Sequence, residues 1–125
     1  MKPIPSGLKT TFLVHVIVGL VFGLIYLLIP ALFGKTTGWP MPDVYPYRII
    51  GAAILAFTAS SWLAYRAPVW DKVRIVVQLE IVWTVLNVLV GLWGLLFAGY
   101  PAIGWVNIVT MGAFAVAFGY FYRRE

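Results

Sequence analysis

The sequence predicts an all-α membrane protein, an up-down-up-down bundle of four transmembrane helices in a single domain over residues 1–125. Of its 125 residues, 62% are apolar and only 10% are charged, whereas a soluble domain carries roughly 25% charged residues. Four apolar stretches are each long enough to cross a hydrocarbon core of about 30 Å. Because the membrane interior offers no water to the backbone, each stretch is expected to be helical. The four spans are expected at residues 8–29, 47–65, 73–97 and 102–122.

The breaks between the spans contain the residues that usually end helices. The first apolar stretch is longer than that of a usual signal peptide, so we expect it to be retained as a helix. Residues 30–46 contain four prolines and two glycines and are expected to form a stiff outer loop. Asp71 is the expected N-cap of the third span. Gly99 and Pro101 mark the end of the third span and the start of the fourth.

The positive charges predict the orientation in a cell membrane. If both termini are cytoplasmic, seven of the nine Lys and Arg residues lie on the inner side, and only Lys35 and Arg48 lie outside. Cations concentrate on the cytoplasmic side of multi-pass proteins. We therefore expect both termini in the cytoplasm. The net charge of +5 is explained by orientation, and no nucleic-acid partner is expected.

A carboxylate inside the third span is the main candidate for function. Glu80 lies roughly 10 Å from the cytoplasmic boundary. At 100° per residue, Glu80, Thr84, Asn87, Gly91 and Gly94 share one helix face, which should point into the bundle. An acidic residue at the centre of a span costs about 2.5 to 3.5 kcal/mol unless it is compensated. Glu80 is therefore expected to be paired, protonated or next to water.

The one histidine is the expected partner of Glu80. His15 lies at a similar depth on the first span, which runs in the same direction as the third, and Ser61 reaches this level on the second span. We expect a buried polar cluster of His15, Ser61, Glu80 and Thr84. Proximity favours the charged forms of His15 and Glu80, and burial disfavours them, so the sequence leaves their protonation open. The cluster has either a structural role or a proton-linked or ligand-binding role.

Four further polar residues have structural explanations. Asn87, Asn107 and Thr110 lie toward the outer half of their spans and are expected to hydrogen-bond across the bundle. Arg48 begins the second span at the outer interface, where it is expected to reach solvent or to hold the loop through Asp43.

The sequence lacks the residues that several kinds of catalysis and metal binding require. There are no cysteines, one histidine and one glutamate within a span, so neither thiol catalysis nor a carboxylate-bridged di-metal site is expected. A bis-histidine haem would need two copies of His15 from a dimer. The hydrolase, zinc-protease and nucleotide-binding motifs do not occur. We expect no metal and no cofactor.

Two segments resemble a known family. Residues 47–51 (YRIIG) and 77–83 (VQLEIVW) resemble the arginine-glycine and buried-acid pattern of small DoxX-like four-helix membrane proteins. The resemblance covers about half of the chain and implies a fold more than a function, since most such proteins have no assigned activity. This chain lacks the cysteines of the redox-active relatives.

Three functions follow as expectations. The first is a non-catalytic membrane component, either a homo-oligomer or an accessory subunit of a larger complex, whose partners are membrane lipid and other membrane subunits. The second is a small carrier, or a protein that binds a lipophile or a proton through His15 and Glu80. The third is an enzyme that acts on a lipid-soluble substrate with the same pair as acid and base. A carrier predicts a cavity that touches His15 and Glu80, and a scaffold predicts dry packing there.

Overall fold

Five helices and no strands make up the chain, and four of the helices are long and apolar enough to cross a membrane. The computed structural model describes residues 1–125. The four candidate spans are α1 (Ser6–Leu28), α3 (Tyr45–Arg66), α4 (Trp70–Phe97) and α5 (Gly104–Arg124), and the short helix α2 (Pro30–Thr37) follows α1. The prediction of an all-helical, membrane-type chain with four apolar spans is confirmed.

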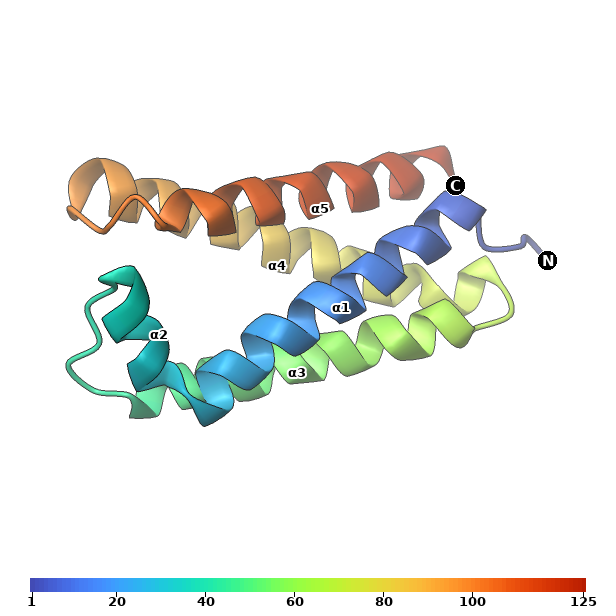
Figure 1. Ribbon diagram of the computed structural model, residues 1–125. Coiled ribbons are helices and arrows are strands. Elements are labelled where there is room, and N and C mark those ends of the chain that lie inside the picture. The colour runs from blue at the N-terminus through green and yellow to red at the C-terminus, as the bar shows by residue number, and fades with distance from the viewer.

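The long helices form two tightly packed pairs. Helix α1 packs against α3 and α4 packs against α5, whereas fewer contacts join the two pairs. The pairs lie close together where both chain termini are found, here called the terminal end, and they diverge toward the opposite end, where α2 lies (Figure 1). This second end is called the α2 end below. The divergence leaves room between the pairs in that half of the molecule.

Glycine allows the backbones of α1 and α3 to touch. A Cβ added to Gly51 would lie 2.6 Å from the backbone nitrogen of Leu27 and 2.9 Å from the carbonyl oxygen of Gly23. On the facing helix, a Cβ added to Gly23 would lie 2.8 Å from the side chain of Leu55. Small residues that permit such close approach are a common basis of helix association in membranes. The α1–α3 pair is therefore held by close backbone packing.

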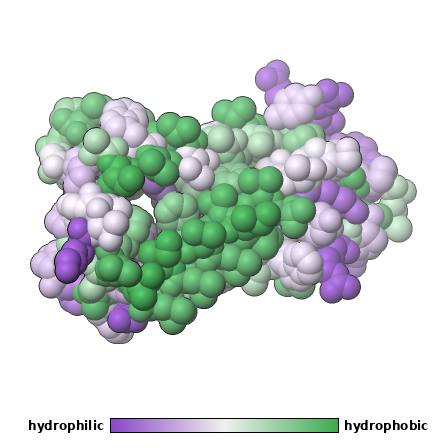
Figure 2. All heavy atoms as spheres, in the orientation of Figure 1, coloured by the Kyte–Doolittle hydropathy of each residue, from purple (hydrophilic) through white to green (hydrophobic).

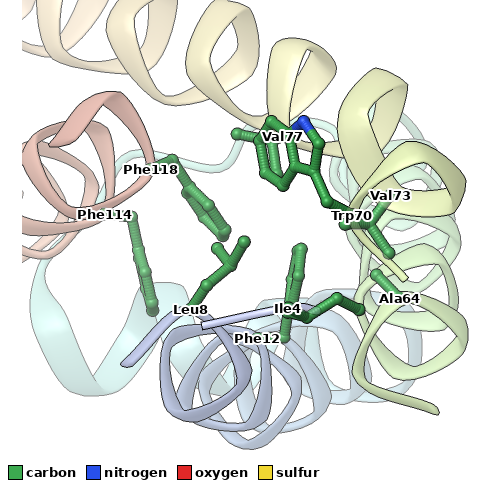
Figure 3. Close-up of a cluster of buried hydrophobic side chains, with 9 residues drawn as sticks. All are labelled: Ile4, Leu8, Phe12, Ala64, Trp70, Val73, Val77, Phe114 and Phe118. Carbon is green, nitrogen blue, oxygen red and sulfur yellow. The ribbon is translucent and has the colours of Figure 1, made fainter. Parts of the chain in front are cut away.

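A cluster of apolar side chains closes the terminal end (Figure 3). Residues from all four long helices and from the segment before α1 contribute to it, and Trp70 also donates its backbone N–H to the Lys2 carbonyl over 3.0 Å. The buried members are Ile4, Leu8, Phe12, Ala64, Trp70, Val73, Val77, Phe114 and Phe118. The interior of the terminal end is therefore filled by apolar side chains.

The surface has the distribution of hydropathy that a membrane requires. Hydrophobic side chains cover the middle of the visible face, and hydrophilic side chains gather at its two ends (Figure 2). Many large apolar residues in the middle are exposed in the isolated chain, including Val116 at 74% and Val82 at 56%. A patch of this extent on a soluble protein would favour aggregation. Lipid is the solvent that matches it.

The structure corrects three details of the predicted elements. Residues 30–37 form helix α2 instead of a loop, because Pro30 occupies a first-turn position that needs no N–H and Gly38 ends the helix at φ 75°. Asp71 is not an N-cap, because α4 already begins at Trp70, whose N–H is bonded to Lys2. The last helix begins at Gly104 and not at residue 102, since residues 101–103 form a turn.

Candidate functional site

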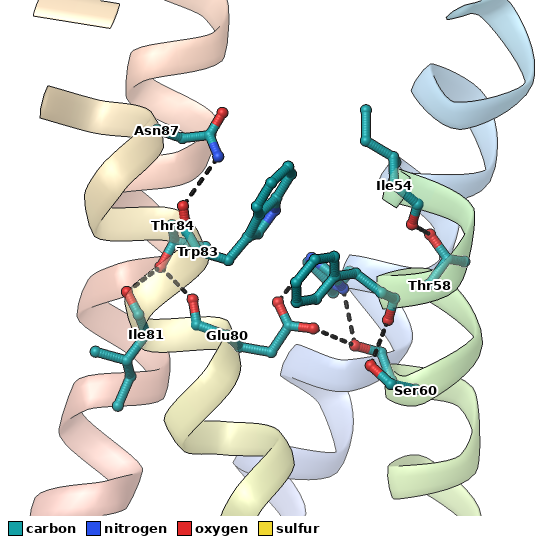
Figure 4. Close-up of polar contacts among 11 residues, drawn as sticks. Ile54, Thr58, Ser60, Glu80, Ile81, Trp83, Thr84 and Asn87 are labelled. Atoms are coloured by element: carbon teal, nitrogen blue, oxygen red, sulfur yellow. Dashed lines mark hydrogen bonds and ion pairs between the residues drawn. The ribbon is translucent and has the colours of Figure 1, made fainter. Parts of the chain in front are cut away.

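Three polar side chains from three helices meet inside the bundle. His15 on α1 places Nδ1 2.8 Å from Ser61 Oγ on α3. Ser61 Oγ donates to Glu80 Oε1 on α4 over 3.3 Å, and His15 Nε2 lies 3.2 Å from Glu80 Oε2. Glu80 reaches across the space between its own helix and the facing pair (Figure 4). His15, Ser61 and Glu80 are all buried, and they are called the polar cluster below.

The hydrogen bonds restrict where the protons of the cluster lie. Ser61 gives its single hydroxyl proton to Glu80, so its oxygen accepts the proton on His15 Nδ1. The contact between His15 Nε2 and Glu80 Oε2 is close but bent, since Oε2 has no well-aligned donor. Facing lone pairs would repel each other there, which places one proton between the two atoms. With that proton on either atom the cluster has no net charge, as its apolar surroundings require.

Neighbouring residues fix the positions of the cluster. The Phe114 ring meets the His15 imidazole edge-on, with the ring centres 4.8 Å apart. Thr84 donates its hydroxyl to the Glu80 carbonyl over 2.7 Å and also approaches the Ile81 carbonyl. Thr84 is therefore beside the cluster but bonded to its own helix. The imidazole is confined between α3, α4 and α5.

A cavity of about 590 Å³ extends from His15 toward the α2 end. Of its 25 lining residues, 17 are hydrophobic, and many of these are aromatic. His15 lines the cavity, whereas Ser61 and Glu80 do not. Cavities of roughly 300 to 1,000 Å³ are typical of small-molecule sites. The polar cluster thus forms part of the cavity floor through the imidazole alone.

Two stacked aromatic pairs cross from one helix pair to the other. Phe57 on α3 and Trp83 on α4 stack with their ring centres 4.7 Å apart, close to the level of the polar cluster. At the α2 end, Trp39 stacks on Tyr100 at 4.9 Å with an interplanar angle of 13°. The Trp39 indole N–H donates to the Tyr47 hydroxyl over 3.2 Å. Trp39 and Tyr100 belong to the two connections at this end, so they form a lid over the cavity.

Removing the lid is expected to open the cavity from the α2 end. An aromatic pair contributes about 0.5 to 1.5 kcal/mol beyond its buried area, so Trp39→Ala should raise access to the cavity about two- to tenfold. Because the chain has no cysteine, the rate at which a water-soluble maleimide labels Thr110→Cys measures this access directly. Trp105→Ala is the matched control, since Trp105 is exposed at the same end and does not line the cavity. Equal labelling rates in both variants would show that Trp39 is not a lid.

The remaining predicted polar residues lie in different surroundings. Asn87, Asn107 and Thr110 all line the cavity, and the one side-chain hydrogen bond among them runs from Asn87 to the Trp83 carbonyl of its own helix, at 2.9 Å. Arg48 does not hold Asp43. It donates to the Leu27 carbonyl over 2.6 Å, because the last carbonyls of α1 lack helical partners and attract a cation.

Two features of the site limit its chemistry. Ser61 is fully buried and is not part of the cavity lining, so its hydroxyl is out of reach of a molecule in the cavity. No three side chains of the His, Cys, Asp or Glu type come together, and His15 with Glu80 is the one such pair inside the bundle. The arrangement is suited to holding a small molecule against a neutral hydrogen-bonded floor.

Most of the cavity has no signature in the sequence. The apolar lining residues, such as Phe22, Phe57 and Trp93, have no distinguishing pattern in the sequence, because aromatic residues are ordinary in membrane spans. One usable signal is the pair Gly19 and Gly23 on α1, whose spacing is typical of close helix contacts.

Comparisons of the chain with known protein families, with curated proteins and with solved structures give no match.

Proposed function

We propose that this chain is a multi-pass protein of the cell membrane that binds a lipid-soluble small molecule between its two helix pairs. In this proposal α1, α3, α4 and α5 cross the membrane alternately, with both termini in the cytoplasm. The orientation is supported by the cations, because seven of the nine lie on segments at the terminal end. The cavity then lies in the outer half of the membrane.

The observation that carries the proposal is the cavity itself. A bundle that served only as a scaffold would pack its interior to a density like that of an organic crystal. Here an apolar cluster fills the interior of the terminal end, whereas the other half contains about 590 Å³ of space lined by aromatic side chains and His15. The cavity touches His15 but not Glu80. Glu80 and Ser61 would hold the imidazole in place, and only the imidazole would meet the bound molecule.

The proposal concerns binding and leaves room for a larger assembly. A homo-oligomer, or an accessory role in a membrane complex, is expected because four helices enclose little interior and almost nothing extends beyond the membrane to bind a soluble partner. Co-purification of neighbouring subunits from native membranes tests that expectation. An enzymatic use of the His15–Glu80 pair would require turnover of the molecule that occupies the cavity, so the identity of that molecule comes first.

Filling the cavity with a large side chain close to His15 should abolish ligand binding. Thr110 lines the cavity one helical turn from Phe114, which packs on His15, so Thr110→Phe places a ring in the binding space. The protein is purified in discs of native membrane, and bound small molecules are extracted and measured by mass spectrometry. A specific compound should co-purify with the wild type and fall at least about tenfold in the variant, which corresponds to about 1.4 kcal/mol.

The matched control is Val109→Phe. Val109 neighbours Thr110 on α5, but it is 67% exposed and does not line the cavity. The compound should remain with this variant at the wild-type level. If all three proteins carried the same molecules in the same amounts, the cavity would hold only bulk lipid, and the proposal would be wrong.

A further inference from the structure

The lining of the cavity indicates an uncharged ligand. Its residues include no Lys, Arg, Asp or Glu, and both ring nitrogens of His15 are already engaged by Ser61 and Glu80. A phosphate, carboxylate or ammonium group would therefore enter a largely apolar space without an opposite charge, at a cost of several kcal/mol. The headgroups of phospholipids and the carboxylates of fatty acids do not suit this site.

The two sides of the cavity differ in their balance of groups, although Trp83 and Trp93 of α4 add aromatic rings to the second side. The side formed by α1 and α3 presents aromatic rings, among them Phe22, Tyr26 and Phe57. Phe57 also stacks on Trp83 of α4, so this aromatic pair reaches the opposite side of the cavity. Flat rings pack on such surfaces in offset-stacked or edge-on arrangements. An aromatic or other planar ring fits this side better than a flexible acyl chain, since it loses less conformational freedom on binding.

The side formed by α4 and α5 presents polar groups that have few partners in the protein. Asn107 and Thr110 lie three residues apart on α5 and so share a helix face, and Asn87 faces the same cavity from α4. Asn87 uses one N–H on the Trp83 carbonyl, which leaves its carbonyl oxygen and one further N–H free. Together the amides and the hydroxyl offer donors and acceptors without charge.

We infer that the ligand is an uncharged, ring-bearing lipophile whose hydroxyl or carbonyl oxygen binds to Asn87, Asn107 and Thr110 while its ring packs against the aromatic side. This inference rests on the proposed function and adds the chemical class of the ligand. The three residues, called the amide subsite below, determine which lipophile is accepted, because polar groups that face an apolar space inside a membrane disfavour a molecule that lacks the oxygen to pair with them.

Three probes with one ring system test the inference. Naphthalene, 2-naphthol and 2-naphthoate share their ring and differ in the polar group. Binding to the wild-type protein in phosphatidylcholine nanodiscs is measured by equilibrium dialysis, as the excess over empty nanodiscs. We expect the excess affinity for 2-naphthol to exceed that for naphthalene about five- to tenfold, and 2-naphthoate to bind no better than naphthalene.

Near-isosteric variants separate the amide subsite from the cavity as a whole. Asn87→Leu and Asn107→Leu should each remove most of the preference for 2-naphthol and leave naphthalene binding unchanged. Gln78→Leu is the control, because Gln78 bonds to the Tyr122 hydroxyl on the exposed surface and does not line the cavity. It should behave as the wild type.

Each other outcome has a definite meaning. Equal binding of naphthalene and 2-naphthol in all proteins would overturn the inference and leave the proposed function standing. Preferential binding of 2-naphthoate would also overturn it, since the site would then accept an anion. If no probe binds above the level of empty nanodiscs, the inference is overturned, and the extraction experiment with Thr110→Phe decides separately whether the proposed function fails with it.

Discussion

Replacing His15 by leucine should lower the free energy of unfolding by about 3 kcal/mol or more, because it leaves the buried Glu80 carboxyl without its imidazole. Replacing Glu80 by leucine should cost less, since a neutral imidazole keeps its hydrogen bond to Ser61. The double variant should recover most of the loss. Apolar residues often replace a buried polar pair at little cost, whereas removing one member leaves the other uncompensated.

A double-mutant cycle measures this coupling. Unfolding of the four proteins is followed by tryptophan fluorescence as sodium dodecyl sulfate is titrated into mixed micelles. The interaction energy between His15 and Glu80 should exceed about 1 kcal/mol. Thr37→Val serves as the second site of a control cycle with His15→Leu, because the Thr37 hydroxyl bonds to the Phe33 carbonyl and the Trp39 N–H at the far end of the molecule. The control pair should be additive.

Additive losses from His15→Leu and Glu80→Leu would contradict the geometry of the polar cluster. Such a result would mean that each side chain is stabilised by its own surroundings and that the 3.2 Å approach of the two residues contributes nothing. Rescue in the double variant would show in addition that the cluster is not needed for folding. A role of the cluster in the cavity that His15 lines would then be separable from its contribution to stability.

The meeting of His15 and Glu80 could be predicted because depth and helical phase are both readable from sequence. Each residue lies at a similar distance from the start of its span, and the two spans run in the same direction. The predicted polar face of the third span is likewise the face that lines the interior, since Glu80 and Thr84 are buried and Asn87, Gly91 and Gly94 face the cavity. Helical periodicity was sufficient for these inferences.

The cavity could not be predicted because it depends on how two helix pairs are inclined to each other. That inclination follows from the sum of many contacts: backbone packing between α1 and α3, the apolar cluster at the terminal end, and the stacked rings of Phe57 with Trp83. None of these contacts has a short sequence motif that would reveal the angle between the two helix pairs. The sequence also does not show that the two helix pairs diverge at the level of Asn87 and Asn107. These residues are therefore expected to bond between helices, whereas in the structure they face the cavity.

Replacing Gly51 by alanine should destabilise the protein by about 1 to 3 kcal/mol, although alanine is normally the better helix former. The added methyl would meet three backbone atoms of α1, the nearest being the Leu27 nitrogen at 2.6 Å and the Gly23 oxygen at 2.9 Å. Backbone cannot rotate away as a flexible side chain can. The helices must move apart, so neighbouring contacts such as that of Gly23 with Leu55 are weakened as well.

Gly119→Ala provides the matched control, because a Cβ added to Gly119 on α5 would meet nothing within 4 Å. In the same detergent titration this variant should be as stable as the wild type or more stable. If Gly51→Ala matched Gly119→Ala, the contact between α1 and α3 would be looser than the structure shows. Because Gly51→Ala moves α1 and α3 apart, it should also disturb the cavity, which Tyr26, Tyr47 and Ile54 line from these two helices. Loss of ligand by Gly51→Ala would therefore be expected along with the loss of stability, whereas Thr110→Phe should lose the ligand alone.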